Sequence, residues 1–304
     1  MNLGGEEESM TRRLGLIGVP SSIGAHWPGQ EKAPLALRKA GLLEYLEEAG
    51  LRVTDRGDLP RTRFRPDSER RHPQNLALVV DVARSVADEV EVTLRAGEVP
   101  LVIGGDCTIE LDGGVDLRTP LDNPTGILDS MGVAHMLGEH GSAEELATMG
   151  PRFPLMEDEK ITLFGYSHNE SEVGTLARRS MPRYPVERVR HGPQKVAAEA
   201  LAYLEETAET FVIHFDVDVI DFVDFPVADV PQINAGLTFR EALACLGVFA
   251  ASSKFAGLVI TEFNPDHADE EGEAAATLVR EVVDAVAGKK ALQKSDGPTD
   301  RERG

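Results

Sequence analysis

Three carboxylates follow an apolar stretch in the second half of the chain: Asp216, Asp218 and Asp221, within residues 214–221, which read HFDVDVID. Residues i and i+2 of a strand point to the same side, so the first two carboxylates are expected to face one spot. Two ionised carboxylates in a dry sheet repel strongly unless a cation or a proton neutralises them. We therefore predict that Asp216 and Asp218 bind a hard cation, with Asp221 bracing the turn. Exposed acids that cap a loop are the alternative.

The elements that must position these acids alternate between apolar strands and amphipathic helices. The strands are expected over residues 14–20, 51–53, 99–105, 160–165, 211–217 and 257–263. The helices are expected over residues 33–49, 75–96, 194–207, 238–251 and 273–287. Apolar strands flanked by helices indicate an α/β fold with a mostly parallel sheet covered on both faces. Ligands bind such sheets at the carboxyl ends of the strands, where the acids lie.

The length of 304 residues is enough for one large α/β domain or two small ones. We predict that residues 12–288 form one large domain, between flexible tails at residues 1–11 and 289–304. The net charge of -21 argues against binding to nucleic acid or to an anionic membrane surface. No apolar stretch is long enough to span a membrane, and the acidic N-terminus does not resemble a signal peptide. With only two cysteines, a disulfide framework is not expected. These features together predict a cytoplasmic protein.

Several segments resemble the arginase/agmatinase (ureohydrolase) family. Residues 104–108 read GGDCT and are similar to the family segment GGDHS, while residues 214–221 are similar to its Ser-x-Asp-x-Asp-x-x-Asp segment. Residues 261–265 read TEFNP and are similar to its Glu-x-Asn-Pro segment. Each piece is weak alone, but their order and combination are specific. Further similarities to the N-terminal third of the family lie at residues 17–21, 29–37 and 57–59, and the likeness runs from about residue 14 to residue 287.

The resemblance implies a three-layer α/β/α sandwich around an eight-stranded parallel sheet. It also implies two Mn²⁺ ions and a hydrolase of non-peptide C–N bonds in linear amidines, which uses a metal-activated hydroxide. The substrate would be a small cationic guanidino or amidino compound, such as arginine or agmatine. Family members usually form trimers or hexamers, so the resemblance also implies a homo-oligomer. Glu262 matches the position that holds the guanidinium charge, and a plain carboxylate at a strand end is the alternative.

Two positions depart from the family in residue type. Cys107 stands where the family has its first histidine ligand, and a thiolate favours Zn²⁺ or iron over Mn²⁺. Asp129 stands where arginases have a histidine that shuttles protons, a role a carboxyl can take only if its pKa is raised. GGDC together with LDSMG at residues 128–132 resembles an arginase-like branch of the family. We predict Cys107 as a metal ligand and Asp129 as an acid/base group, with a small buried residue as the alternative for Cys107.

His135 lies on an expected helix start shortly after Asp129. It could replace the missing histidine as proton shuttle or ligand, and we include it among the catalytic candidates. A residue on the face of a helix is the alternative.

A gap precedes Asp116. Residues 116–120 read DLRTP and match the end of the family's Asp-x-His-x-Asp ligand segment, so Asp116 is predicted as a metal ligand. About one strand and the end of its preceding helix are missing, together with an Asp and a His ligand, although Asp112 lies close by in sequence. One strand of the sheet is thus expected to be shortened or missing, and the chain would hold fewer than two ions. A gene-model error, an internal deletion and an altered fold would each explain the gap.

Two functions follow from these observations. The first is an arginase-like, metal-dependent hydrolase that acts on a guanidino or amidino C–N bond. The second is a catalytically impaired protein of the ureohydrolase fold with a binding or regulatory role, which the lost ligand segment favours.

Overall fold

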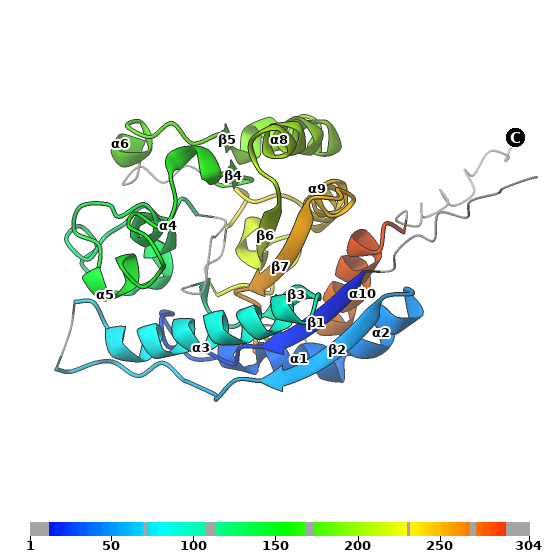
Figure 1. Ribbon diagram of the computed structural model, residues 1–304, viewed down its shortest axis with the longest axis horizontal. Coiled ribbons are helices and arrows are strands. Elements are labelled where there is room, and N and C mark those ends of the chain that lie inside the picture. Colours follow the sequence, from blue (N-terminus) through cyan, green and yellow to red (C-terminus); the bar gives the residue numbers. More distant parts are fainter. Residues whose placement is uncertain are drawn as a thin grey trace, which may run out of the picture.

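A five-stranded parallel sheet forms the centre of the computed structural model, with strand order β2-β1-β3-β7-β6 (Figure 1). The structure describes residues 12–69, 72–107, 114–167, 173–229, 232–267 and 272–289. The predicted tail 1–11 lies outside these residues, as do Asp112 and all of the predicted tail 289–304 except Lys289. The strands of the sheet are β1 (Arg13–Gly18), β2 (Arg52–Asp58), β3 (Val99–Ile103), β6 (Phe211–Asp216) and β7 (Phe255–Thr261).

The inner strands are short apolar runs, as expected for a parallel sheet that is buried on both faces. The register places Leu101 of β3 beside Leu16 of β1 and Leu258 of β7, and Leu258 also pairs with Ile213 of β6. Side chains alternate between the two faces of each strand. Leu16, Leu101 and Leu258 therefore share one face, and all three belong to the largest hydrophobic cluster.

Helices cover both faces of the sheet, which gives the predicted three-layer α/β/α sandwich (Figure 1). One face of β1 and β3 packs against α3 (Leu76–Arg95), where Val86 contacts a cluster that includes Ile17, Val102 and Val259. The other face packs against the remaining long helices. These are α1 (Ala33–Lys39), α2 (Leu42–Glu48), α8 (Pro193–Thr207), α9 (Phe239–Ala250) and α10 (Glu273–Val286).

The prediction of a single helix over residues 33–49 is wrong in one respect, because this segment forms two helices, α1 and α2. Gly41 separates them with a φ of 89°. This left-handed conformation is readily adopted by glycine and ends a regular helix. Short elements between the long ones complete the fold. They are α4 (Gly132–Met136), α5 (Glu144–Ala147), α6 (Val173–Leu176), α7 (Val186–Arg190), β4 (Leu163–Phe164), β5 (Arg183–Tyr184) and 3₁₀ turns η1 (Gln30–Lys32), η3 (Asp129–Met131), η4 (Asp158–Lys160) and η5 (Val217–Val219).

The main sheet has five strands over the described residues, whereas the resemblance implied eight. β4 and β5 form a separate two-stranded parallel sheet. A cavity of about 640 Å³ lies between β6 and residues 159–164, which include β4. This is where a further strand would join the two sheets, in agreement with the predicted shortened or missing strand. In the described part of the chain, no helix is both long and apolar enough to cross a membrane.

Candidate active site

The carboxyl ends of four strands meet at one edge of the sheet, and polar residues follow each of them. The loops after β1 and β3 approach closely there, because the Asp106 amide donates a hydrogen bond to the carbonyl of Ser21 at 3.1 Å. A Cβ atom on Gly105 would lie 1.5 Å from the same carbonyl oxygen. Only glycine therefore permits this approach. The chain after β7 joins the same edge, since the Glu262 amide donates to the Gly105 carbonyl at 2.8 Å.

Cys107, Asp129 and Glu262 form a compact buried group at this edge. Each offers one ligand atom, and these atoms lie within 4.8 Å of one another. Their exposed fractions are 2%, 5% and 1%. The three side chains come from loops after β3 and β7 and from η3. The group therefore combines one predicted metal ligand with two predicted catalytic residues.

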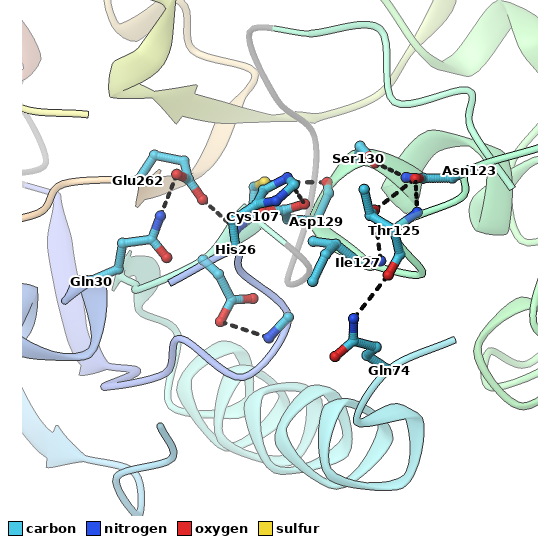
Figure 2. A network of polar contacts seen from close by, with 12 residues as sticks. His26, Gln30, Gln74, Cys107, Asn123, Thr125, Ile127, Asp129, Ser130 and Glu262 are labelled. Carbon is cyan, nitrogen blue, oxygen red and sulfur yellow. Dashed lines mark hydrogen bonds and ion pairs between the residues drawn. The ribbon is translucent and has the colours of Figure 1, made fainter. Parts of the chain in front are cut away.

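The Glu262 carboxylate is oriented by two donors (Figure 2). The Cys107 amide donates to Oε1 at 3.2 Å, and Gln30 Nε2 donates to Oε2. The φ of Glu262 is 65°, in the left-handed region that residues other than glycine rarely adopt. Such backbone strain persists where the surroundings hold it, and it is frequent at functional sites. The fold therefore fixes both the position and the direction of this carboxylate.

Asp129 lies beside two further groups. The Cys107 thiol donates to the Asp129 carbonyl at 3.2 Å, and His26 Nε2 lies 3.9 Å from Asp129 Oδ1 (Figure 2). Burial lowers the pKa of His26, and the charge of Asp229 opposes this only in part. His26 is thus mainly neutral at pH 7 and able to accept a proton. A proton taken up by the Asp129 carboxylate can therefore pass to the neutral imidazole of His26.

Sequence reasoning missed His26 and Gln30. His26 lies in the loop after β1 and Gln30 begins η1, within a segment that reads HWPGQ at residues 26–30, and no periodic pattern sets such a segment apart. One signal was available. Gln30 lies within the stretch 29–37 that resembles the family, and His26 lies shortly before it.

The first two acids of the opening triplet lie at this edge too, but the strand argument for them is wrong in detail. β6 ends at Asp216, and Asp218 lies in the following turn η5. Asp216 caps this turn, because its Oδ1 accepts the Asp218 amide at 2.8 Å. Its Oδ2 accepts the Thr261 hydroxyl at 3.2 Å. Both aspartates are buried, so the two carboxylates remain close in sequence and shielded from water although they do not share one strand face.

Asp221 braces the turn, which confirms the role predicted for it. Its Oδ1 accepts the Val223 amide at 3.0 Å, and its Oδ2 accepts the Gly236 amide at 3.2 Å. These bonds hold the loop after η5 against the chain that enters α9.

Asp116 contacts α4, the helix that contains His135. Asp116 is buried with a φ of 51°, and its carbonyl accepts the Ala134 amide at 2.9 Å. His135 is buried, and its Nδ1 lies 2.6 Å from the Met131 carbonyl. Burial lowers the pKa of His135 to about 4, so its ring is neutral at pH 7.

The predicted metal ligands Cys107, Asp116, Asp216 and Asp218 are all described and buried. No three of them bring their ligand atoms within 4.8 Å of one another; within the described ranges only the group around Cys107 does so. The edge nevertheless carries several buried carboxylates, so a small cation is electrostatically favoured there.

Comparisons with known proteins agree with this architecture. A family model described as the arginase family matches residues 12–285. An arginase from Bacillus caldovelox is 29% identical over 292 residues, which cover 88% of this chain and 95% of the relative. Arginase-1 from Bos taurus is 30% identical and covers 84% of this chain and 86% of its own length. A crystal structure of arginase from Bacillus cereus superposes with a TM-score of 0.82 at 26% identity and covers 93% of this chain and 100% of that one.

Proposed function

This chain belongs to the arginase family, and we propose that it is a metal-dependent hydrolase that cleaves a C–N bond of a guanidino or amidino compound. The observation that carries the proposal is the buried group of Cys107, Asp129 and Glu262. It places a possible ligand, an acid/base group and a carboxylate for the substrate's charge within reach of one small molecule. Its position at the carboxyl ends of parallel strands is where ligands of this class of fold bind.

The donor set suits a divalent metal. Burial makes uncompensated carboxylates costly, so a cation would stabilise them. The thiol of Cys107 is a soft donor, and Zn²⁺ accepts such a donor together with hard carboxylates. Mn²⁺, expected from the family resemblance, would use the carboxylates of Asp116, Asp216 and Asp218 in preference to the thiol. When bound, the metal supplies a Lewis acid and lowers the pKa of water.

Glu262 is the group that would hold the substrate. A carboxylate pairs with a planar guanidinium through charge-assisted hydrogen bonds. Because Cys107 and Gln30 fix its two oxygens, little reorganisation is needed when the cation arrives. This arrangement discriminates in favour of a planar cation over a neutral amide.

Asp129 and His26 are the groups that would move a proton. Asp129 stands in the same buried group as Glu262, and His26 Nε2 lies 3.9 Å from its carboxylate. We propose that Asp129 exchanges a proton with the reacting nitrogen and that His26 connects it toward solvent, since the His26 side chain is 32% exposed.

A second function is a binding or regulatory role without turnover. The absence of the Asp-x-His ligand segment favours it. The hydrogen bond from the Cys107 thiol to the Asp129 carbonyl favours it as well, because a thiol that keeps its proton is a poor ligand.

Metal content and turnover separate the two functions. The full chain is dialysed against a chelator, equilibrated with Mn²⁺ or Zn²⁺, and analysed by mass spectrometry for bound metal. Urea or ammonia release is then measured with arginine, agmatine and shorter guanidino acids. If the chain is a hydrolase, we expect it to bind metal stoichiometrically and to release urea or ammonia from at least one compound in a metal-dependent way. Calorimetric binding of a guanidino compound without release would establish the second function, and the absence of both metal and guanidino binding would contradict the proposal.

A further inference from the structure

The cavity beside β6 is distinct from the group around Cys107. We call it the β6 slot and define it by β6 on one side and residues 159–164 on the other. Its volume of about 640 Å³ is within the range of ligand-binding cavities. Apolar side chains of α8 and α9 form one face of the slot, among them Leu204, Leu246 and Phe249.

The edge of β6 that faces the slot has none of the usual protection. Edge strands normally carry charged residues or proline that prevent pairing with other chains. The opposite edge of the sheet follows this rule, because β2 reads RVTDRGD. β6 reads FVIHFD, pairs with β7 alone among the described strands, and exposes 54% of Val212. This sequence is typical of a strand with neighbours on both sides.

The opposite wall of the slot is also extended chain. Residues 161–164 run along it, and Phe164 packs against Phe249 with 5.2 Å between ring centroids. The hydroxyl of Thr162 is buried and has no hydrogen-bond partner in the described part of the chain. A buried polar atom without a partner is costly, so this wall has a group that an occupant would satisfy.

His214 provides a second such group, on the β6 side of the slot. The Thr261 hydroxyl donates its one hydrogen to Asp216, so His214 Nε2 must donate to the Thr261 oxygen. Nδ1 of the neutral ring then has a lone pair. This atom is buried and has no partner among the described residues. Hydrogen bonds thus connect His214, at the slot, through Thr261 to Asp216, which is a predicted metal ligand.

We propose that the β6 slot binds an extended peptide segment, which pairs with the free edge of β6 and reaches Asp216 through His214 and Thr261. The strand at each wall favours a peptide, because main-chain pairing supplies affinity along an open edge. A strand that already belongs to the sheet of a second copy has one edge in use and could satisfy one wall only. β6 has six residues, so the paired segment is about 20 Å long.

The chemistry of the slot defines the peptide further. Side chains that point toward α8 and α9 should be apolar, since Leu246 and Phe249 lie there. Side chains that point the other way meet the buried ring of His214 and the exposed Val212, where polar side chains can reach water or the ring nitrogen. The net charge of -21 disfavours an acidic peptide. The expected ligand is therefore a neutral or basic segment in which apolar and polar residues alternate.

A synthetic peptide tests the proposal with the full chain. The probe is a fluorescein-labelled peptide of about eight residues in which valine and threonine alternate between terminal lysines. The control peptide has the same side chains but is N-methylated at every second residue, which removes the N–H donors along one edge. The variant Val212→Lys introduces a charge at the open edge, and Val223→Lys is its match, because Val223 is 67% exposed and is not among the residues that line the slot. Melting temperatures establish that both variants fold.

Fluorescence anisotropy should show saturable binding of the probe, weakened at least about tenfold by Val212→Lys and by N-methylation but unchanged by Val223→Lys. Amide hydrogen exchange of residues 211–216 should slow in the complex. Absence of saturable binding would overturn the proposal. Equal affinity of the N-methylated peptide would overturn it as well, because it would show that the slot accepts apolar molecules without strand pairing. Equal effects of the two lysine variants would place the peptide elsewhere.

Discussion

The main-chain amide of Cys107 donates a hydrogen bond to the Glu262 carboxylate at 3.2 Å, although the two residues are 155 positions apart in the sequence. The contact joins the loop after β3 to the loop after β7, two strands that pair in register through Leu101 and Leu258. It fixes the carboxylate that we propose for substrate binding against the thiol that we propose for metal binding. Substrate affinity and metal affinity are therefore expected to depend on each other.

Replacement Glu262→Gln should remove the charge that holds the guanidinium and keep most of the side-chain shape. We expect kcat/KM to fall on the order of 100-fold or more, because a buried charge-assisted pair becomes a neutral contact. The melting temperature should change by only a few degrees. Steady-state urea release measures the effect, and Glu47→Gln on the exposed face of α2 is the matched control. Activity of the Glu262 variant close to that of the unmodified chain would exclude this carboxylate from substrate binding.

Cys107 should determine which metal the site prefers. We expect the unmodified chain to take up Zn²⁺ in preference to Mn²⁺, and Cys107→His to shift the ratio of bound metals toward Mn²⁺ by about tenfold. Mass spectrometry after equilibration with equal concentrations of both ions gives the ratio. Cys245→Ala changes the second cysteine of the chain, which is buried in α9, and should leave the ratio unaltered. An identical ratio in all three proteins would show that the thiol is not a ligand.

His26 should affect catalysis more than binding. Replacement His26→Phe keeps a ring beside Trp27, whose centroid lies 5.3 Å from that of His26, but removes the nitrogen near Asp129. We expect kcat to fall on the order of 100-fold while KM changes little, since the proton path from Asp129 is interrupted. His72→Phe is a control in an exposed loop. A rise in KM with unchanged kcat would instead assign His26 to substrate binding.

The sequence predicted the strands best where they are buried. The runs at residues 99–105 and 257–263 contain β3 and most of β7, because strands covered on both faces must be apolar. β2 was expected to begin at residues 51–53, but its end at Asp58 was not predicted, since its charged residues at the edge hide the pattern. Two-residue strands such as β5 are too short for any periodicity to appear.

The candidate site was predicted in part for a related reason. Residues that follow directly on strong strands, such as Glu262, could be placed at the sheet edge from the strand alone. Asp218 was misplaced because the sequence does not reveal where a strand turns into a 3₁₀ helix. His26 and Gln30 come from a loop whose path depends on long-range contacts, such as the one between Gly105 and Ser21, and local patterns do not encode those contacts.

Gly105→Ala should disrupt this loop. The added Cβ would lie 1.5 Å from the Ser21 carbonyl oxygen, and a backbone atom cannot move aside as a flexible side chain can. We expect a loss of about 3 kcal/mol in the free energy of unfolding, together with loss of activity because Cys107 is displaced. Chemical denaturation measures the change. Gly174→Ala in α6 is the control, since a Cβ there meets nothing within 4 Å. Equal stability of the two variants would show that the loops after β1 and β3 separate easily.

The stability of the fold should decrease as the pH falls, in a range set by the pKa of His135. Burial lowers the pKa of this histidine to about 4 in the folded chain, whereas an unfolded chain has a value near 6.5. Between these values the unfolded state binds more protons, so protonation favours unfolding. The contribution is fully present above about pH 6.5 and is lost as the pH falls, and the loss amounts to about 3 kcal/mol by pH 4. His135→Asn keeps a donor for the Met131 carbonyl but cannot be protonated, so the difference in unfolding free energy between pH 7 and pH 4.5 should be smaller by about 2–3 kcal/mol in this variant. Urea denaturation at both pH values measures it, with His140→Asn as an exposed control that should behave like the unmodified chain. Parallel pH profiles for all three proteins would mean that water reaches the ring of His135 in the folded state.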